Sequence, residues 1–301
     1  MKTFMKPRTI KKIIFVLFVA VALCVVIAPF RDLFKESSAT DIYSHIPLIP
    51  IVSAVLFFLN RKDIFGTKDS LSAAGLAVMA AAAGLFLIGK GFAVGMNDLA
   101  SVSALASVLF VAGAFLLLFG WEAFRKAAFP FAFLLWIVPL PAVIMDRVIA
   151  FLVIASTELT RFLFEVLGVP FVREGSVFHL PDLTIEIATQ CSGIRSSFAL
   201  LITTVLAAHL FLKKFGNKAI LALAVFPVAV LKNAIRIVTL YLLSYYIDWG
   251  IIEGGFLHKS GGFIFFGLGL AILGAGLLAL RSRERKGAGL PPSKGIISPH
   301  S

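Results

Sequence analysis

Long apolar runs separated by short polar segments dominate this chain, and each long run is typical of a membrane-spanning helix. A helix needs about 20 apolar residues to cross the ~30 Å hydrocarbon core of a bilayer. Runs of that kind predict about eight spans, at residues 12–30, 45–60, 71–90, 102–120, 127–145, 194–212, 218–246 and 261–280. The pattern therefore predicts an all-α fold, a polytopic transmembrane helical bundle.

Residues 149–171 form a further apolar run, but this run carries three charges. Glu158, Arg161 and Glu165 follow each other at spacings of three and four, which places them on one face of a helix. Three charges make a lipid-facing span costly. We therefore expect an amphipathic helix that either lies at the outer interface or packs within the bundle.

Basic residues fix the expected orientation of the spans. They cluster before the first predicted span and after every even-numbered one, at Lys2, Lys6, Arg8, Lys11, Lys12, Arg61, Lys62, Lys68, Arg125, Lys126, Lys213, Lys214, Lys218, Arg281, Arg283, Arg285 and Lys286. Loops rich in Lys and Arg stay in the cytoplasm. The prediction is a multi-pass protein of the cytoplasmic (inner) membrane with both termini inside. Residues 1–281 form one integral membrane domain, and 282–301 a basic, disordered cytoplasmic tail.

A short extended segment lies on the outer side just before the sixth predicted span. Residues 177–180 and 183–188 flank Pro181-Asp182, a pair typical of turns. In the second run, Thr184 and Glu186 alternate with apolar residues. We expect a small extracytoplasmic β-hairpin there.

Composition agrees with a membrane protein and removes one class of function. Hydrophobic residues make up 59% of the chain and charged residues 15%, against ~45–50% apolar residues in an average soluble domain. The net charge of +12 would suggest nucleic acid for a soluble domain. Here the basic residues lie between apolar runs, so nucleic-acid binding is not expected. One of the two cysteines, Cys24, lies inside the first apolar run and is expected to be a small buried residue.

Three chemically versatile side chains are expected at one depth in the membrane. Cys191 lies at the outer start of the sixth predicted span, and His258 lies just outside the eighth on the same side. Arg236 follows the cytoplasmic Lys218 by 18 residues, which is ~27 Å at ~1.5 Å per residue and close to the outer edge of the core. This arrangement predicts a candidate site at the outer surface.

The three residues together can perform acyl transfer. A cysteine attacks as its thiolate, and a neighbouring histidine can take the thiol proton. An arginine stays charged in a dry site and can stabilise the oxyanion that forms at an attacked carbonyl. Gly193 would allow a close approach to the thiol.

Arg236 and three other polar residues have two possible interpretations each. Asn233 lies one turn below Arg236, which favours a bundle-facing role for that arginine over snorkelling to headgroups. Arg195 either shares the face of Cys191 or anchors the helix at the interface. Glu186 either orients His258 or is an exposed strand residue. Lys232 is deep for a lysine and either pairs with an acidic group or lines a polar cavity. The other histidines show no ligand spacing, so neither a metal site nor a cofactor is expected.

Three stretches carry a family resemblance: "CSGIRSS" from Cys191, "NAIR" from Asn233 and "HKSGG" from His258. They resemble the three signature blocks of the exosortase/archaeosortase family, in the same order. The stretch "GVPFVREGSVFHLPDLTIEIATQCSGIRSS" is similar to that family throughout, "WIVPLPAVIMDRV" also fits, and "YSHIPLIPIV" fits more weakly. The resemblance covers residues 127–280 well and the first third of the chain poorly.

The resemblance implies a membrane cysteine transpeptidase or endopeptidase. Its implied substrates are exported proteins whose C-terminal signal has a short motif, an apolar helix and a basic tail. Cys191 matches the family's nucleophile, Arg236 its arginine and His258 its histidine. Membrane lipid is an implied partner, and an amine on a lipid or glycan is an implied acceptor. The alternative from another class is a transporter or lipid-handling protein in which Arg236 and Lys232 bind an anionic substrate; such a protein should tolerate loss of Cys191.

Overall fold

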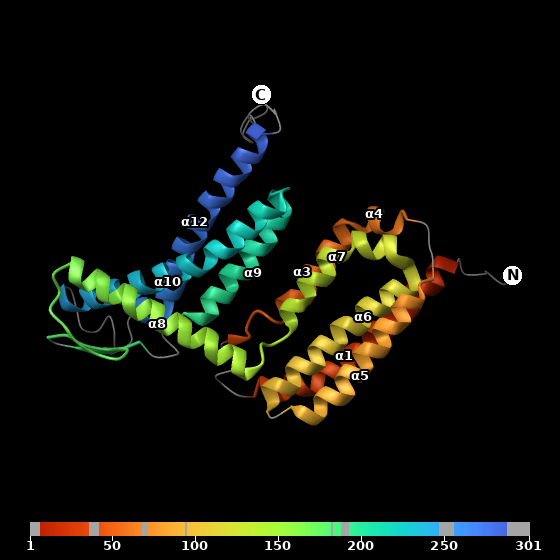
Figure 1. The fold of residues 1–301 in the computed structure, drawn as a ribbon, viewed down its shortest axis with the longest axis horizontal. Coiled ribbons are helices and arrows are strands. Elements are labelled where there is room, and N and C mark those ends of the chain that lie inside the picture. The colour runs from red at the N-terminus through yellow and green to blue at the C-terminus, as the bar shows by residue number, and fades with distance from the viewer. Residues whose placement is uncertain are drawn as a thin grey trace. The chain divides into compact units, whose positions relative to one another are not determined.

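The fold is helical, with one small sheet. The computed structural model describes residues 7–35, 42–67, 71–93, 95–181, 183–187, 193–246 and 256–287, with 256–261 described as helix backbone only. The elements, in order (Figure 1), are α1 (Pro7–Leu33), α3 (Leu48–Leu59), α4 (Arg61–Phe65), α5 (Ala73–Phe92), α6 (Met96–Lys126), α7 (Ala128–Leu134), η1 (Leu135–Ile137), α8 (Ala142–Val166), β1 (Val172–Glu174), β2 (Val177–His179), β3 (Thr184–Glu186), α9 (Ile194–Phe211), α10 (Phe215–Tyr246) and α12 (Phe256–Gly287).

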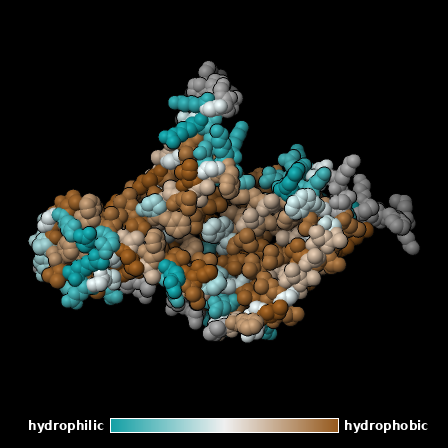
Figure 2. All heavy atoms as spheres, in the orientation of Figure 1, coloured by the Kyte–Doolittle hydropathy of each residue, from teal (hydrophilic) through white to brown (hydrophobic). Residues whose placement is uncertain are grey.

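The described helices confirm a polytopic membrane protein with fewer spans than the eight predicted. Within the described ranges, six helices are long and apolar enough to cross a membrane: α1, α5, α6, α9, α10 and α12. A seventh results if α7 and α8 form one broken span. Apolar residues cover much of the visible surface, and hydrophilic residues gather at helix ends such as the C-terminal end of α12 (Figure 2). Such a surface suits a lipid environment.

The chain divides into two compact units, Met1–Asp146 and Arg147–Ser301. In the first unit, α1 and α5 pack against α6. The approach of α5 to α6 depends on glycine, because a Cβ added to Gly75 would lie 2.3 Å from the backbone nitrogen of Leu117. Small residues at such contacts let membrane helices approach closely. That residues 1–281 form a single domain stays a prediction.

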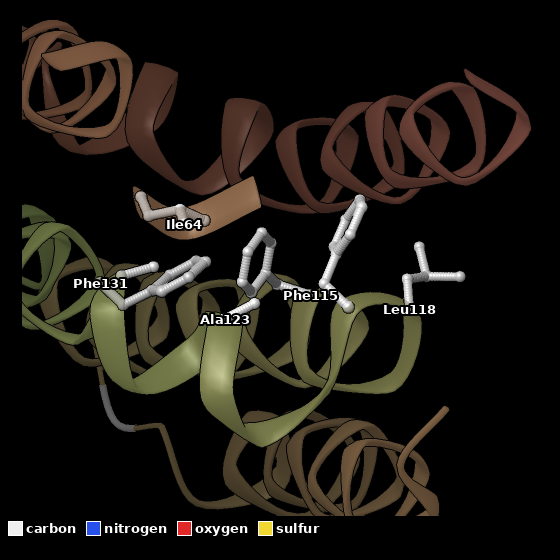
Figure 3. Packing of buried hydrophobic residues seen from close by; sticks show 7 residues of the cluster. Ile64, Phe115, Leu118, Ala123 and Phe131 are labelled. Atoms are coloured by element: carbon white, nitrogen blue, oxygen red, sulfur yellow. The ribbon is translucent and has the colours of Figure 1, made fainter. Parts of the chain in front are cut away.

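Aromatic side chains fill the core of the first unit. Ile64, Phe115, Ala123 and Phe131 belong to one buried cluster, in which side chains from α4, α6 and α7 meet (Figure 3). The rings of Phe115 and Phe131 lie 5.2 Å apart, within the range of favourable aromatic pairs. Cys24 on α1 is exposed, so the prediction that it is buried is wrong. That side of α1 has no partner helix among the described residues that buries it.

The fifth predicted span, 127–145, is wrong as a single straight helix. Helical structure stops at Ile137 and resumes at Ala142, and the two parts are bent by 84°. Prolines at 139 and 141 explain the break, since proline lacks an N–H and disfavours helix at the residue before it. Backbone oxygens exposed by the break are satisfied from α6. Ser101 Oγ donates to Pro139 O at 2.7 Å, and Asn97 Nδ2 donates to Leu140 O at 2.7 Å.

The same break brings together two segments that the family resemblance singled out. Tyr43, in "YSHIPLIPIV", donates its hydroxyl to Asn97 Oδ1 at 2.8 Å, and Asn97 in turn holds Leu140 of "WIVPLPAVIMDRV". Burial raises the pKa of Tyr43 to about 12, so the phenol stays a neutral donor at physiological pH. These two segments are therefore parts of one polar junction in the first unit.

The charged helix predicted at 149–171 is present and belongs to α8, which begins at Ala142. Arg161 contacts Glu158 at 3.2 Å and Glu165 at 2.5 Å, so the three charges share one face as predicted. The hairpin strands are confirmed as β2 and β3, and β1 adds a third strand in the order β1-β2-β3. Phe178 of the sheet packs on Phe164 of α8 with ring centroids 5.6 Å apart.

The C-terminal helix extends past the tail boundary predicted at residue 281, because α12 continues to Gly287. Its last turns are anchored by Glu284. The carboxylate accepts hydrogen bonds from the backbone N–H groups of Lys213 and Lys214 at 2.8 and 2.9 Å, and from Asn217 Nδ2 at 2.8 Å. Glu284 therefore satisfies two backbone donors in the connection between α9 and α10 and one side-chain donor in the first turn of α10.

Glu284→Ala should lower the thermal unfolding temperature of the detergent-purified protein by a few degrees. The change removes the acceptor of three donors at the turn between α9 and α10. Ser282→Ala is the matched control, since Ser282 is exposed on the same turn of α12. Equal unfolding temperatures for the two variants would show that Glu284 does not anchor this turn.

Candidate active site

The start of α9 has a fixed geometry in the second unit. Gly193 caps the helix in a left-handed backbone conformation, with φ 66° and ψ 21°. Residues other than glycine rarely adopt this conformation. Its carbonyl oxygen accepts hydrogen bonds from Ser196 Oγ and Ser197 Oγ, both at 2.9 Å. The first turn of α9 is thereby tied to the glycine that precedes it.

A pair of buried polar residues on α10 packs against this turn. Lys232 is 3% exposed and Asn233 is 1% exposed. The ammonium of Lys232 donates to Ser196 Oγ at 2.5 Å. A Cβ added to Gly193 would lie 3.0 Å from Asn233 Oδ1 and 3.1 Å from Lys232 Nζ. A side chain at position 193 would therefore press on Asn233 and Lys232, which would have to shift to accommodate it.

Helix α8 joins the same polar layer through Asn233 of α10. Asn233 Nδ2 donates to Ser156 Oγ at 3.1 Å, and the rings of Phe164 and Tyr241 lie 5.5 Å apart. These two contacts are separated by eight residues on each helix. The helices therefore run parallel and stay in register over ~12 Å, so Thr160 lies at the level of the turn that carries Arg236.

Polar atoms without a partner collect at this level. Thr160 Oγ1, Asn233 Oδ1 and Arg236 Nε are buried and have no hydrogen-bond partner among the described residues. A buried polar atom left unpaired costs about 1–3 kcal/mol. A carbonyl oxygen placed beside Arg236 would gain a charged donor and relieve that cost. The geometry thus provides a free guanidinium donor one turn beyond Asn233, which contacts Gly193.

Of the three residues predicted to act together, one is placed. Arg236 lies half-buried on α10. Cys191 lies outside the described residues, and chain connectivity to Gly193, two positions later, keeps their Cα atoms within about 7 Å of each other. His258 belongs to the first turn of α12, where only the backbone is described. The approach of Cys191 and His258 to Arg236 stays a prediction.

The supporting residues separate into a buried and an exposed group. Gly193 and Asn233 meet in the polar layer, whereas Arg195 on α9 and Glu186 on β3 are exposed. The exposure of Glu186 agrees with its interpretation as an exposed strand residue. A role of Glu186 toward His258 stays a prediction, and so does a role of Arg195 beside Cys191. Within the described part of the chain, no group of three or more His, Cys, Asp or Glu residues could hold a metal ion.

Sequence reasoning missed the serines that complete this layer. Ser156 and Ser196 partner Asn233 and Lys232, yet serines are common near helix starts and faces. The available signal was Lys232, which is too deep in the membrane for an unpaired ammonium. The depth of Lys232 predicts that its ammonium has a partner, but it does not identify that partner. Ser196 is identified only by the packing of α9 on α10.

Gly193→Ala should impair the site through contact as well as through backbone strain. The left-handed conformation costs an alanine about 1–2 kcal/mol, and the new methyl group would press on Asn233 and Lys232. Gly168→Ala is the matched control, because Gly168 has φ +68 and nothing within 4 Å of an added Cβ. We expect both variants to lose stability in detergent through backbone strain, Gly193→Ala somewhat more because of the added contact, and only Gly193→Ala to lose processing, by tenfold or more. Equal processing by both would exclude a functional contact at Gly193.

Comparison with known proteins agrees with the sequence resemblance and extends it. A sequence model of the transmembrane exosortase family matches residues 37–275. The match begins well before residue 127, so it includes most of the first unit. Neither the curated proteins nor the solved structures gave a match.

Proposed function

Because this chain belongs to the transmembrane exosortase family, we propose that it is a membrane-embedded cysteine endopeptidase or transpeptidase. Its substrates are exported proteins with a C-terminal sorting signal made of a short motif, an apolar helix and a basic tail. The cleaved proteins are sorted to, or anchored at, the cell surface. Lipid surrounds the enzyme, and an amine on a lipid or glycan is the acceptor when the acyl group is transferred.

One observation carries this proposal beyond family membership. The buried guanidinium Nε of Arg236 has no partner among the described residues, and it lies one turn from Asn233, which contacts Gly193. Gly193 in turn is two residues from Cys191. A charged donor whose Nε is unpaired among the described residues therefore lies close to the residue that follows Cys191 by two positions, and acyl transfer uses such a donor to stabilise the oxyanion.

The reaction proceeds through a thioester. The thiolate of Cys191 attacks the scissile carbonyl, and the resulting oxyanion is stabilised by Arg236. His258 takes the thiol proton and then donates it to the leaving amine, so the C–N bond breaks as the tetrahedral intermediate collapses. Water or an acceptor amine then attacks the thioester, releases the Cys191 thiol and yields a carboxylic acid or a new amide.

The substrate's apolar helix lies in the bilayer against the bundle, with its scissile bond at the outer surface. This orientation follows from the basic loops, which assign the cytoplasmic side to both termini. The basic tail of the signal then stays inside, where anionic lipid attracts it. The proposed location is the cytoplasmic (inner) membrane, with the site on its outer face.

A membrane-impermeant maleimide should label Cys191 in intact spheroplasts of a Cys24→Ser strain. Replacing Cys24 leaves Cys191 as the one native cysteine in the sequence, so any labelling reports on Cys191. Labelling of an engineered cysteine at Ser282, on the expected cytoplasmic side, is the matched control and should appear only after lysis. The reverse pattern for the two positions would invert the proposed orientation.

The function itself is tested by co-expression with an exported protein from the same genome whose C-terminus has a short motif, an apolar helix and a basic tail. Processing should shorten that protein by the length of its signal, and mass spectrometry of the mature C-terminus should show one cleavage site. Loss of the basic tail or of the motif from the substrate should abolish shortening. Unchanged substrate size for every such candidate, with the enzyme correctly inserted, would contradict the proposal.

A further inference from the structure

We propose that Lys232 is a positioning residue for this reaction, holding the first turn of α9 on α10 so that Gly193 and Arg236 keep one relative arrangement. The inference rests on the proposed function, since it assigns a role within that site. Lys232 does not match the nucleophile, the arginine or the histidine of the family resemblance.

Burial of the Lys232 ammonium costs folding free energy. Its side chain is 3% exposed, and none of the ion pairs within the described ranges includes it. Its hydrogen bond goes to a neutral hydroxyl, Ser196 Oγ. Arg236, the next cation, lies four residues further on the same helix face. An apolar residue would remove the cost of burying this charge, so its presence calls for a role that an apolar residue cannot fill.

The hydrogen bonds of Ser196 show what the ammonium does. The hydroxyl accepts from Lys232 Nζ at 2.5 Å and donates to the carbonyl oxygen of Gly193 at 2.9 Å. The hydroxyl is therefore both an acceptor and a donor, and its two hydrogen bonds link Lys232 of α10 to Gly193, the residue that caps α9. The chain fixes the rotation of the first turn of α9 relative to α10, which Asn233 also ties to Ser156 of α8.

The methylene stem of Lys232 reaches a third helix. A Cβ added to Gly269 of α12 would lie 3.5 Å from Lys232 Cδ and 2.9 Å from Leu200 Cδ1, so α12 packs directly over the stem. Lys232 is therefore at the junction of α9, α10 and α12. Cys191 precedes α9 in the sequence, Arg236 lies on α10 and His258 belongs to the first turn of α12. The junction around Lys232 therefore joins the three helices that carry or follow the predicted catalytic residues.

The test uses four variants of the full-length protein in detergent: Lys232→Met, Ser196→Ala, Ser196→Thr and the double variant Lys232→Met with Ser196→Ala. Methionine keeps the length of the stem and removes the ammonium. Ser196→Ala leaves the ammonium buried without its acceptor, so it should be the least stable variant. The double variant removes both partners and should recover thermal stability toward that of wild type. Ser196→Thr keeps the hydroxyl and should retain activity.

The readout is kcat and KM on a synthetic peptide that carries the motif and apolar helix of the exported protein found by co-expression. A displacement of about 1 Å can cost about 10²-fold in rate, so kcat should fall by ten- to a hundredfold in Lys232→Met and in the double variant, with KM little changed. If kcat of the double variant recovers together with its stability, Lys232 is only structural and the inference is wrong. A Cys191→Ala sample is run in parallel, and turnover by that sample would instead refute the proposed function.

Discussion

Replacing Cys191 by alanine is expected to abolish processing and to let the full-length substrate accumulate in the membrane. Alanine has no nucleophile, and no other cysteine lies near the start of α9 in the sequence. Covalent catalysis fails completely without its nucleophile, so the loss should reach the detection limit of an immunoblot that follows substrate size. Membrane insertion of the variant should be unchanged, because alanine is smaller and apolar.

Cys24→Ala is the matched control for this experiment. Cys24 is exposed on α1 in the first unit, and its removal should leave processing at the wild-type level. A transporter or lipid-handling protein would tolerate both replacements equally. Cleavage at the normal position by the Cys191→Ala variant would therefore exclude Cys191 as the nucleophile and contradict a cysteine peptidase.

Arg236→Ala should lower the processing rate by about 10²–10³-fold, the usual effect of losing one oxyanion donor. The Nε of Arg236 is buried and unpaired among the described residues, so a reacting carbonyl that reaches it need not displace another acceptor from that atom. Arg236→Lys should restore only part of the rate, because an ammonium keeps the charge but lacks the planar fork of donors. Rates are measured from the initial decay of full-length substrate after a pulse of synthesis.

Arg161→Ala is the control for loss of an arginine in the same unit. Arg161 is exposed and forms ion pairs with Glu158 and Glu165 on the surface of α8, and pairs of this kind contribute little. Processing by the Arg161 variant should stay within about twofold of wild type. If Arg236→Lys were as active as wild type, charge alone would suffice and the oxyanion geometry assigned to Arg236 would be wrong.

Much of the helical architecture could be predicted from hydropathy. The predicted runs at 12–30, 71–90, 194–212 and 218–246 correspond to α1, α5, α9 and α10. The run at 102–120 ends at Gly120, where α6 leaves helical geometry with φ 82°. Such runs are readable because each membrane helix satisfies its own backbone hydrogen bonds and shows lipid an apolar surface.

The prediction failed where tertiary contacts replaced helical hydrogen bonds. A hydropathy window counts residues 127–145 as one apolar run. The helix nevertheless stops before Pro139, and the carbonyl oxygens of Pro139 and Leu140 accept hydrogen bonds from side chains of α6. The first strand, β1, was missed because it is three residues long and two of them, Arg173 and Glu174, are charged. Its register comes from pairing with β2, which local propensity does not encode.

For a similar reason, the sequence predicted the depth of the candidate site residues in the membrane but not their neighbours. Helical rise predicted that Arg236 lies at the outer edge of the core. Asn233, one turn below, is 1% exposed, and the bundle-facing role of Arg236 stays a prediction. The rise gives depth along one helix and says nothing about which neighbour it meets. The partners of Lys232 and Asn233 therefore emerged only from the packing of α8 and α9 on α10.

The mass of the enzyme during turnover tests directly whether a thioester forms on Cys191. The purified protein is mixed with the synthetic substrate peptide, quenched with acid within seconds, and analysed by intact-mass and peptide mass spectrometry. We expect a transient adduct on Cys191 whose mass equals that of the N-terminal fragment as a free acid minus one water. Neutral hydroxylamine should remove this adduct. Cleavage of the peptide at the normal site with no such adduct at any time point, or an adduct on another residue, would contradict a thioester on Cys191.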